Sequence, residues 1–269
     1  MVRKILNEAA KKLTNSPTPL LDARVLLSKA INCENALLVF RDLTESEITT
    51  FNEYIEKRMQ GIPVSYITGE KEFMGLNFTL NNSTLIPRPD TECLVEKVIE
   101  LNSFSAPQIL DLCTGSGCIG ISLAHMINNS LVELTDISPE ALDAANKNIS
   151  LHNLNSRVRA YKLDVVSDAI EKKYDIITAN PPYIPTEVVK ELDVSRFEPV
   201  RALDGGADGL DFYRIIIEKA YNALNENGLL ALEIGYDQGE SVPKLMDKFK
   251  SVWVFKDYGN NDRVVIGTK

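Results

Sequence analysis

The chain has few of the residues that metal sites and disulfide frameworks require. It contains two histidines, His125 and His152, and four cysteines that form no Cys-x-x-Cys pair. A structural or catalytic zinc site needs three or four Cys, His or acidic ligands at suitable spacing, so we expect no metal. Small secreted proteins carry a denser set of cysteines, and we therefore expect these four to be reduced thiols.

Long apolar runs and clusters of basic residues are also missing. No stretch approaches the roughly 18 apolar residues of a membrane-spanning helix, and residues 1–8 turn acidic before a signal-peptide core can form. These patterns predict a cytoplasmic protein with no membrane partner. The net charge is −9 over 269 residues. Because nucleic-acid-binding surfaces are rich in Lys and Arg, we expect no direct nucleic-acid binding.

The N-terminal part of the chain predicts a small helical domain. Apolar residues recur at helical spacing over residues 1–70. Thr44 with Glu47 three residues later is typical of a capping box, and Thr18-Pro19 predicts another helix start. This domain is either a structural cap or a docking surface for a macromolecular substrate, and the residues favour neither. Residues 71–86 contain turn residues between short apolar runs, which predicts a linker hairpin.

Residues 87–269 predict an α/β fold. Strands alternate with helices, which is typical of a doubly wound parallel sheet. The connection between the last two strands, residues 257–262, is too short for a crossover helix, so these strands must pair antiparallel. We expect a seven-stranded, mostly parallel sheet with one antiparallel strand. Predicted strands are 108–113, 131–135, 158–163, 174–179, 228–234, 251–257 and 263–267, and predicted helices are 90–101, 118–128, 139–151, 211–225 and 239–249.

A glycine-rich turn follows the first of these strands. Gly115, Gly117 and Gly120 lie between the strand and a helix, where backbone N–H groups can meet a ligand. Asp136 closes the next strand, at a position where a carboxylate accepts hydrogen bonds from ribose hydroxyls. The pattern predicts a cofactor that contains adenosine. By itself it leaves both NAD and S-adenosyl-L-methionine open.

Two carboxylates, together with the segment after the fourth strand that is described next, favour S-adenosyl-L-methionine. A carboxylate at Asp111, just before the glycines, suits the cationic amino-acid tail that NAD lacks. Asp164 closes the third strand, where it can reach an adenine amino group, although an acid there alone is more often a helix cap. Neither histidine ends a strand, where a dehydrogenase would need a proton-transfer residue.

The most informative segment is Asn180-Pro181-Pro182-Tyr183, directly after the strand 174–179. Two prolines cannot extend a strand, because neither has an N–H for the ladder. The chain must therefore turn at the carboxyl end of the strand, where open α/β sheets bind their ligands. An Asn amide, unpaired carbonyls and an aromatic ring suit a planar group that bears an NH₂. The segment predicts methyl transfer to an amide or to a base amino group.

These segments together resemble the release factor glutamine methyltransferases, a family of class I S-adenosylmethionine-dependent enzymes. The resemblance covers essentially the whole chain and rests on residues 67–73, 85–92, 111–117, 180–183, 196–199 and 257–260. It implies a substrate-docking helical domain (1–70), the linker hairpin (71–86) and a class I methyltransferase domain (87–269). The implied substrate is the side-chain amide of the Gly-Gly-Gln glutamine in class 1 peptide chain release factors. We expect a monomer by default. The alternative is a DNA or rRNA amino-methyltransferase, which shares the Asn-Pro-Pro-Tyr segment.

The resemblance also implies the site residues. The substrate would contact Asn180, Pro181, Pro182 and Tyr183. The cofactor would contact Cys113, Thr114, Gly115, Ser116, Gly117, Asp136, Asp164, Val165 and Asn180, in addition to Asp111. Two positions depart from the wider class. Cys113 replaces a usual glycine, so we expect a negative φ there, and Val165 stands where relatives can have an aromatic side chain.

Overall fold

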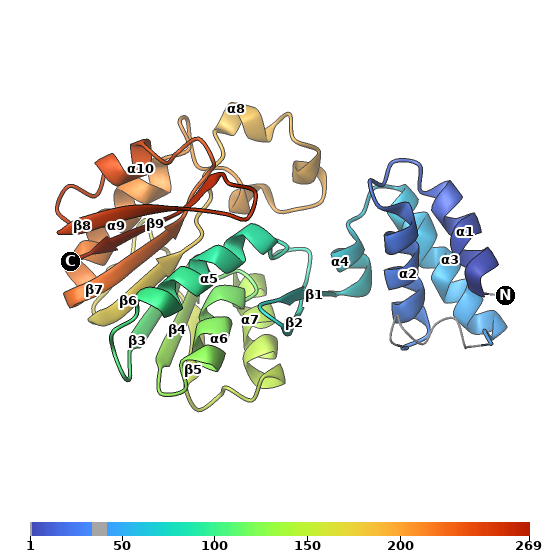
Figure 1. The fold of residues 1–269 in the computed structure, drawn as a ribbon, viewed down its shortest axis with the longest axis horizontal. Helices are drawn as coiled ribbons and strands as arrows, with labels where there is room; N and C mark the ends of the chain where they lie inside the picture. Colours follow the sequence, from blue (N-terminus) through green and yellow to red (C-terminus); the bar gives the residue numbers. More distant parts are fainter. Residues whose placement is uncertain (1, 34–41) are drawn as a thin grey trace. The chain divides into compact units, whose positions relative to one another are not determined.

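The computed structural model describes residues 2–33 and 42–269. They divide into two compact units, Met1–Glu70 and Lys71–Lys269 (Figure 1). The first unit contains helices α1 (Val2–Lys12), α2 (Pro19–Ala30), α3 (Glu45–Met59) and α4 (Val64–Thr68), which enclose an apolar core of their own. The predicted capping box at the start of α3 is confirmed. The Thr44 N–H donates to Glu47 Oε2 at 2.8 Å, and the Glu47 N–H donates to Thr44 Oγ1 at 3.3 Å.

The second unit begins with a hairpin of β1 (Glu70–Phe73) and β2 (Leu76–Thr79) and continues into a seven-stranded sheet. Its strands are β3 (Gln108–Leu112), β4 (Leu131–Asp136), β5 (Val158–Lys162), β6 (Tyr174–Ala179), β7 (Leu224–Glu233), β8 (Ser251–Lys256) and β9 (Asp262–Thr268). Its helices are α5 (Pro89–Leu101), α6 (Cys118–Met126), α7 (Pro139–Leu151), α8 (Thr186–Val189), α9 (Asp211–Ala223) and α10 (Ser241–Lys244).

The strand order confirms the predicted fold class. The sheet runs β5-β4-β3-β6-β7-β9-β8, and β9 is antiparallel to both of its neighbours. The pairs among β3 to β7 are parallel. From β3 the chain adds β4 and β5 on one side, and it then returns to add β6 on the other side of β3. The switch point of the sheet therefore lies between β3 and β6, which are parallel neighbours. Ligands of doubly wound sheets bind at this switch point.

Two apolar cores cover the two faces of the sheet. One contains residues of α5, α6, α7 and the hairpin packed on alternate strand residues such as Ile109, Ile176 and Ala231. The other contains residues of α9 and the segment around α10, packed on the intervening strand residues such as Leu110 and Leu232. Because side chains alternate along a strand, the face of any polar residue at a strand end follows from these assignments.

One predicted helix is wrong. We expected a helix over 239–249, but α10 covers only Ser241–Lys244. The chain after it closes through i to i−3 bonds, from Met246 N–H to Pro243 O and from Phe249 N–H to Met246 O, both 3.0 Å. This tighter turn packs Met246 and Phe249 against Gly267 of β9. The contact is so close that a Cβ added to Gly267 would lie 2.3 Å from Met246 Cε. Packing against the sheet therefore overrides the helical pattern.

No helix in the described parts of the chain is long and apolar enough to cross a membrane.

Candidate active site

A cavity of about 450 Å³ lies at the carboxyl ends of the central strands. It is lined by the loops after β3, β4, β5 and β6, together with residues that precede and begin α5. This size is in the range of small-molecule sites. Of the residues expected at the site, those that line the cavity are Cys113, Thr114, Gly115, Ser116, Asp136, Asp164, Val165, Asn180 and Pro182. Asp111, Gly117, Pro181 and Tyr183 are outside its lining.

Asp111 lies beneath the cavity. Its carboxylate is fully buried and accepts hydrogen bonds from the hydroxyls of Thr114 and Thr178 and from the Gly120 N–H. Burial raises the pKa of Asp111 to about 6, although these three donors act in the opposite direction. The Asp111 carboxylate therefore connects the glycine loop, through Thr114 and Gly120, to β6, through Thr178.

The backbone at Cys113 differs from the expectation. Its φ is +56° instead of negative. The next residue, Thr114, is held by two bonds: its N–H donates to Thr135 O of β4 at 2.9 Å and its hydroxyl donates to Asp111. The left-handed backbone at Cys113 allows Thr114 to reach both partners. It costs roughly 1–2 kcal/mol for a residue with a Cβ. Burial holds the pKa of the Cys113 thiol well above its usual value, so it is a neutral wall of the cavity.

The glycine loop is also held by a residue that sequence patterns did not identify. Asn148 of α7 is fully buried and donates through Nδ2 to Ser116 O at 2.9 Å and to Thr79 O at 3.0 Å. Its Oδ1 accepts from the Thr79 N–H at 2.8 Å. One side chain therefore ties the loop to strand β2. It stands among other polar residues of the helix and has no sequence feature that sets it apart from them, so only the tertiary contact shows its role.

Asp136 ends β4 at the cavity wall. Its Oδ2 accepts from the Gly115 N–H at 2.9 Å and its Oδ1 accepts from the Ser138 N–H at 3.0 Å. A carboxylate has about four acceptor positions. Asp136 therefore holds the loop with one position on each oxygen and keeps the others for a ligand with hydroxyl groups.

Asp164 lies in the loop after β5, where residues 165–167 form a turn and no helix begins, so it does not cap a helix. It lines the cavity, and its carboxylate also accepts from the Val166 N–H and the Ser167 hydroxyl, each at 2.9 Å. These bonds hold its pKa below the usual value. The same loop is fixed by Lys219 of α9, whose Nζ donates to the carbonyls of Val165, Val166 and Asp168 at 2.7 to 2.9 Å.

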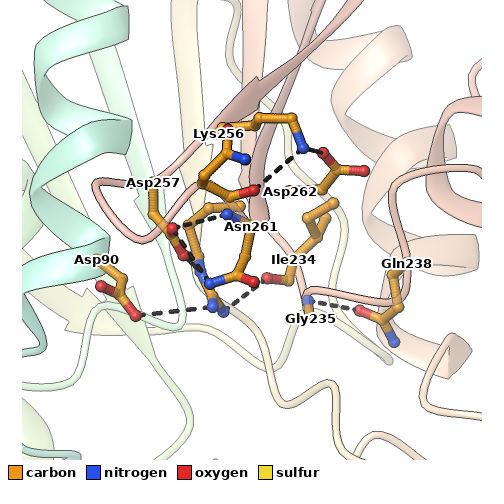
Figure 2. A network of polar contacts seen from close by, with 10 residues as sticks. Asp90, Ile234, Gly235, Gln238, Lys256, Asp257, Asn261 and Asp262 are labelled. Carbon is orange, nitrogen blue, oxygen red and sulfur yellow. Dashed lines mark hydrogen bonds and ion pairs between the residues drawn. The ribbon is translucent and has the colours of Figure 1, made fainter.

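Hydrogen bonds from Gln238 hold the corner Asn180–Tyr183 in place. Gln238, which is buried, donates through Nε2 to Tyr183 O at 3.1 Å and to Gly209 O at 3.2 Å. Its Oε1 accepts from the Gly235 N–H at 2.9 Å (Figure 2). The corner is therefore anchored to the loop after β7, and its Asn180 and Pro182 face the cavity.

One wall residue of the cavity forms an ion pair. Arg88, which lines the cavity, is paired with Glu198, a carboxylate that is almost fully buried. The other oxygen of Glu198 accepts from the Ile86 N–H at 3.2 Å. This contact joins the segment before α5 to the loop after β6. It brings together two of the segments on which the sequence resemblance rested.

A glycine beside the corner allows a direct test of its packing. Gly209 has a φ of +74°, and an added Cβ would lie 2.3 Å from Tyr183 O. We expect Gly209→Ala to lower the free energy of unfolding by roughly 1–3 kcal/mol more than Gly75→Ala, because overpacking adds to the backbone strain. Gly75 is a matched control, with a φ of +73° and no atom within 4 Å of its added Cβ. Urea unfolding of both variants measures the difference, and equal losses would contradict the close packing.

Comparison with known proteins first defines the class. The family model described as "Methyltransferase small domain" matches residues 89–197. The crystal structure of the hMettl16 catalytic domain in complex with MAT2A 3'UTR hairpin 6 aligns with a TM-score of 0.58 at 16% identity, over 80% of this chain and 81% of that one. A methyltransferase from Pyrococcus furiosus aligns with a TM-score of 0.52 at 22% identity, over 72% and 89%. The fold is that of the α/β methyltransferases.

Curated relatives then define the family. Release factor glutamine methyltransferases from Clostridium botulinum and Moorella thermoacetica are both 40% identical to this chain. The first match covers 93% of this chain and 92% of the relative, and the second covers 97% and 96%. The "PrmC N-terminal domain" model matches residues 4–69. The chain belongs to the release factor glutamine methyltransferase family, and it is an enzyme that transfers methyl groups.

Proposed function

We propose that this enzyme transfers a methyl group from S-adenosyl-L-methionine to the side-chain amide nitrogen of the glutamine in the Gly-Gly-Gln motif of class 1 peptide chain release factors. One observation carries the proposal. Asn180 and Pro182 of the proline corner line the same cavity as the glycine loop, Asp136 and Asp164. A nitrogen held at the corner and a cofactor held by the loops would therefore meet within one cavity.

The residues present fit this cofactor. Asp136 has free acceptor positions for two ribose hydroxyls, and Asp164 stands where an adenine amino group can donate to its carboxylate or loop. Val165, Leu163 and Phe212 supply apolar wall for the adenine ring. Gly115 and Ser116 line the cavity before α6, where the chain can approach the amino-acid tail closely. When bound, this cofactor supplies a methyl group activated by a sulfonium.

The corner residues would position the acceptor. An amide nitrogen is a poor nucleophile, because its lone pair is delocalised into the carbonyl. We infer that the Asn180 side-chain oxygen and the Pro181 backbone carbonyl accept the two amide hydrogens, which would aim the nitrogen along the line of attack. Tyr183 would pack on the flat amide. Such positioning can lower a barrier by roughly 7–11 kcal/mol at its best, and the two acceptors would also stabilise positive charge that grows on the nitrogen.

The decisive experiment is incubation of the purified protein with a class 1 release factor and cofactor that carries an isotope-labelled methyl group. We expect one label, placed by peptide mass mapping on the Gly-Gly-Gln glutamine. A release factor with that glutamine changed to alanine is the control and should take up none. Label on another residue, or transfer to DNA or rRNA instead, would contradict the proposal.

Asp136 gives a prediction about the cofactor alone. We expect Asp136→Ala to weaken cofactor binding by about tenfold to a hundredfold, because hydrogen bonds to a charged group contribute about 1.5–3 kcal/mol. Calorimetric titration with S-adenosyl-L-methionine measures the change. Asp143→Ala, an exposed acid on α7, removes the same charge away from the cavity and should bind as the wild type does. Unchanged affinity of the Asp136 variant would rule out the ribose contact.

A further inference from the structure

A buried carboxylate stands beside the proposed acceptor site, and the sequence patterns did not point to it. Glu233 is the last residue of β7 and is only 2% exposed. Ala179 of β6 pairs with Leu232 of β7, so the residues that follow them, Asn180 and Glu233, leave neighbouring strands at the same level. They also leave on the same sheet face, because side chains alternate and the pair before them lies in the opposite core.

Glu233 has fewer hydrogen-bond and ion-pair partners among the described residues than a buried carboxylate usually has. Its Oε2 has no hydrogen-bond partner among the residues that the structure describes. The side chains of Thr91 and Asn180 lie close enough to the carboxylate to favour its ionised form. Both of these residues line the cavity, whereas Glu233 is outside the lining. The carboxylate therefore lies directly behind two cavity residues.

The surrounding charges are already committed to other partners. The nearby cation is Arg263 of β9, whose Nε pairs with Asp257 at 3.1 Å and whose Nη2 lies 3.6 Å from Asp90 of α5 (Figure 2). Its Nη1 donates to Ile234 O at 3.1 Å. Arg263 thus acts on Glu233 only through space, and no ion pair to Glu233 occurs in the described structure.

The remaining polar neighbours are two phenols and a thiol. The Tyr213 hydroxyl of α9 donates to the backbone O of Glu233 at 2.7 Å. Burial raises the pKa values of the Tyr183 and Cys118 side chains, and the nearby charge of Glu233 raises them further. A buried carboxylate with so little compensation costs stability, so a leucine or glutamine would serve the sheet better.

The chemistry of the asparagine amide gives the carboxylate a use. An Asn side chain presents a C=O on one side and an NH₂ on the other, and its neighbours decide which side faces which way. An ionised carboxyl group can only accept hydrogen bonds, so the NH₂ of Asn180 must face Glu233. The Oδ1 of Asn180 then faces away from Glu233. This is the orientation that a substrate amide, as a donor, requires.

We propose that Glu233 is a positioning residue that fixes the Asn180 amide with its oxygen toward the cavity. The inference rests on the proposed function, because it concerns how the acceptor amide is held. Protonation of Glu233 would remove this constraint, since a carboxylic acid can donate to Asn180 Oδ1 and stabilise the reversed amide. Burial raises the pKa of Glu233 to about 7, with Asp90 acting in the same direction and Thr91, Arg263 and Asn180 against it. Positioning should therefore be lost as the pH falls below neutrality.

The test is a double-mutant cycle of Glu233→Gln and Asn180→Ala in the full chain. Methyl transfer to a class 1 release factor is followed under single-turnover conditions, and cofactor affinity and melting temperature are measured in parallel. We expect Glu233→Gln to slow transfer by roughly tenfold to a hundredfold, as for other groups that orient a reacting residue, with cofactor affinity unchanged. If Glu233 acts through Asn180, the double variant should be no slower than Asn180→Ala alone.

Two controls separate this role from a structural one. Glu133→Gln changes a mostly buried carboxylate of β4, 12% exposed, near the opposite ends of the strands, and should leave the transfer rate unchanged. The wild-type rate should fall below pH 7, and this decline should be absent from Glu233→Gln. The wild-type profile also decides the matter if that variant fails to fold, and a flat profile would overturn the inference.

The outcomes distinguish the two proposals. Normal transfer by Glu233→Gln, or losses that multiply in the double variant, would overturn the positioning role and leave the proposed function intact. A wild-type protein that methylates no release factor would overturn both.

Discussion

Replacing Asn180 with alanine is expected to lower the turnover number by about a hundredfold to a thousandfold, which is the usual cost of removing one preorganised hydrogen-bonding group from a transition state. The side-chain oxygen of Asn180 would hold one hydrogen of the acceptor amide and stabilise the charge that develops on its nitrogen. The remaining acceptor, the Pro181 carbonyl, belongs to the backbone and survives the substitution. Some activity should therefore persist.

Cofactor affinity should change little in the same variant. The contacts expected to hold the cofactor lie on other loops, at Asp136, Asp164 and the glycine turn, and these loops are braced by Asn148 and Lys219. Single-turnover transfer to a release factor and calorimetric titration with the cofactor measure the two quantities separately. Asn146→Ala removes the same side chain from an exposed position on α7 and serves as the control. Near-normal turnover without Asn180 would refute the positioning mechanism.

The fold could be predicted because its signals are local. Most strands of the sheet contain a short apolar run, and the short connection 257–262 forces β8 and β9 into an antiparallel pair. The segment 239–249 failed because its apolar spacing also fits a tighter turn. Only the contact of Met246 and Phe249 with Gly267 of β9 decides between a helix and that turn.

The site could be predicted where residues end a strand or form the turn directly after one. Asp136, Asp164 and Asn180 were found this way, and all three line the cavity. Asn148, Lys219 and Gln238 lie within or beside helices, and the carbonyls to which they donate are 29 to 69 residues away along the chain. No local pattern marks such contacts. The positive φ of Cys113 was missed for the same reason. The hydrogen bond from the Thr114 N–H to Thr135 O of β4, a distant residue, helps to impose it.

Glu233 was missed although it also ends a strand. It belongs to a run of apolar residues, Leu229–Leu232, and a single acid at the end of such a run has no distinct meaning in the sequence. Its significance comes from the pairing of β6 with β7, which places it next to Asn180. The contact is therefore a property of sheet order.

The same residue yields the largest expected change in stability. Burial raises the pKa of Glu233 from its usual 4.5 to about 7 in the folded protein. Between these two values the folded state binds more protons than the unfolded state, so stability falls as the pH rises through this window. At about 1.4 kcal/mol per pKa unit, the ionised carboxylate costs the folded protein roughly 3 kcal/mol above pH 7.

Glu233→Gln should therefore gain stability relative to the wild type by up to about 3 kcal/mol when the pH is raised from 5 to 8. Any packing or hydrogen-bond cost of the glutamine is present at both pH values, so the difference between them isolates the ionisation. Urea unfolding of both proteins at each pH measures it. The fold would then carry a carboxylate that weakens it at the pH where Asn180 must be held, which a structural role alone does not explain.

Glu133 provides a control of opposite sign. Burial acts to raise the pKa of Glu133, but Lys172, Arg159, Tyr161 and Tyr174 outweigh it and lower the pKa to about 2. Its carboxylate therefore stabilises the folded state above pH 4.5, and this contribution is lost as the pH falls toward 2. Glu133→Gln should lose stability relative to the wild type at pH 8 and recover it in acid. Because Glu133 titrates below pH 4.5, Glu133→Gln should show almost no change relative to the wild type between pH 5 and 8. If it shifted there in the same direction as Glu233→Gln and by as much, ionisation of Glu233 could not be the cause, and its raised pKa would have to be abandoned.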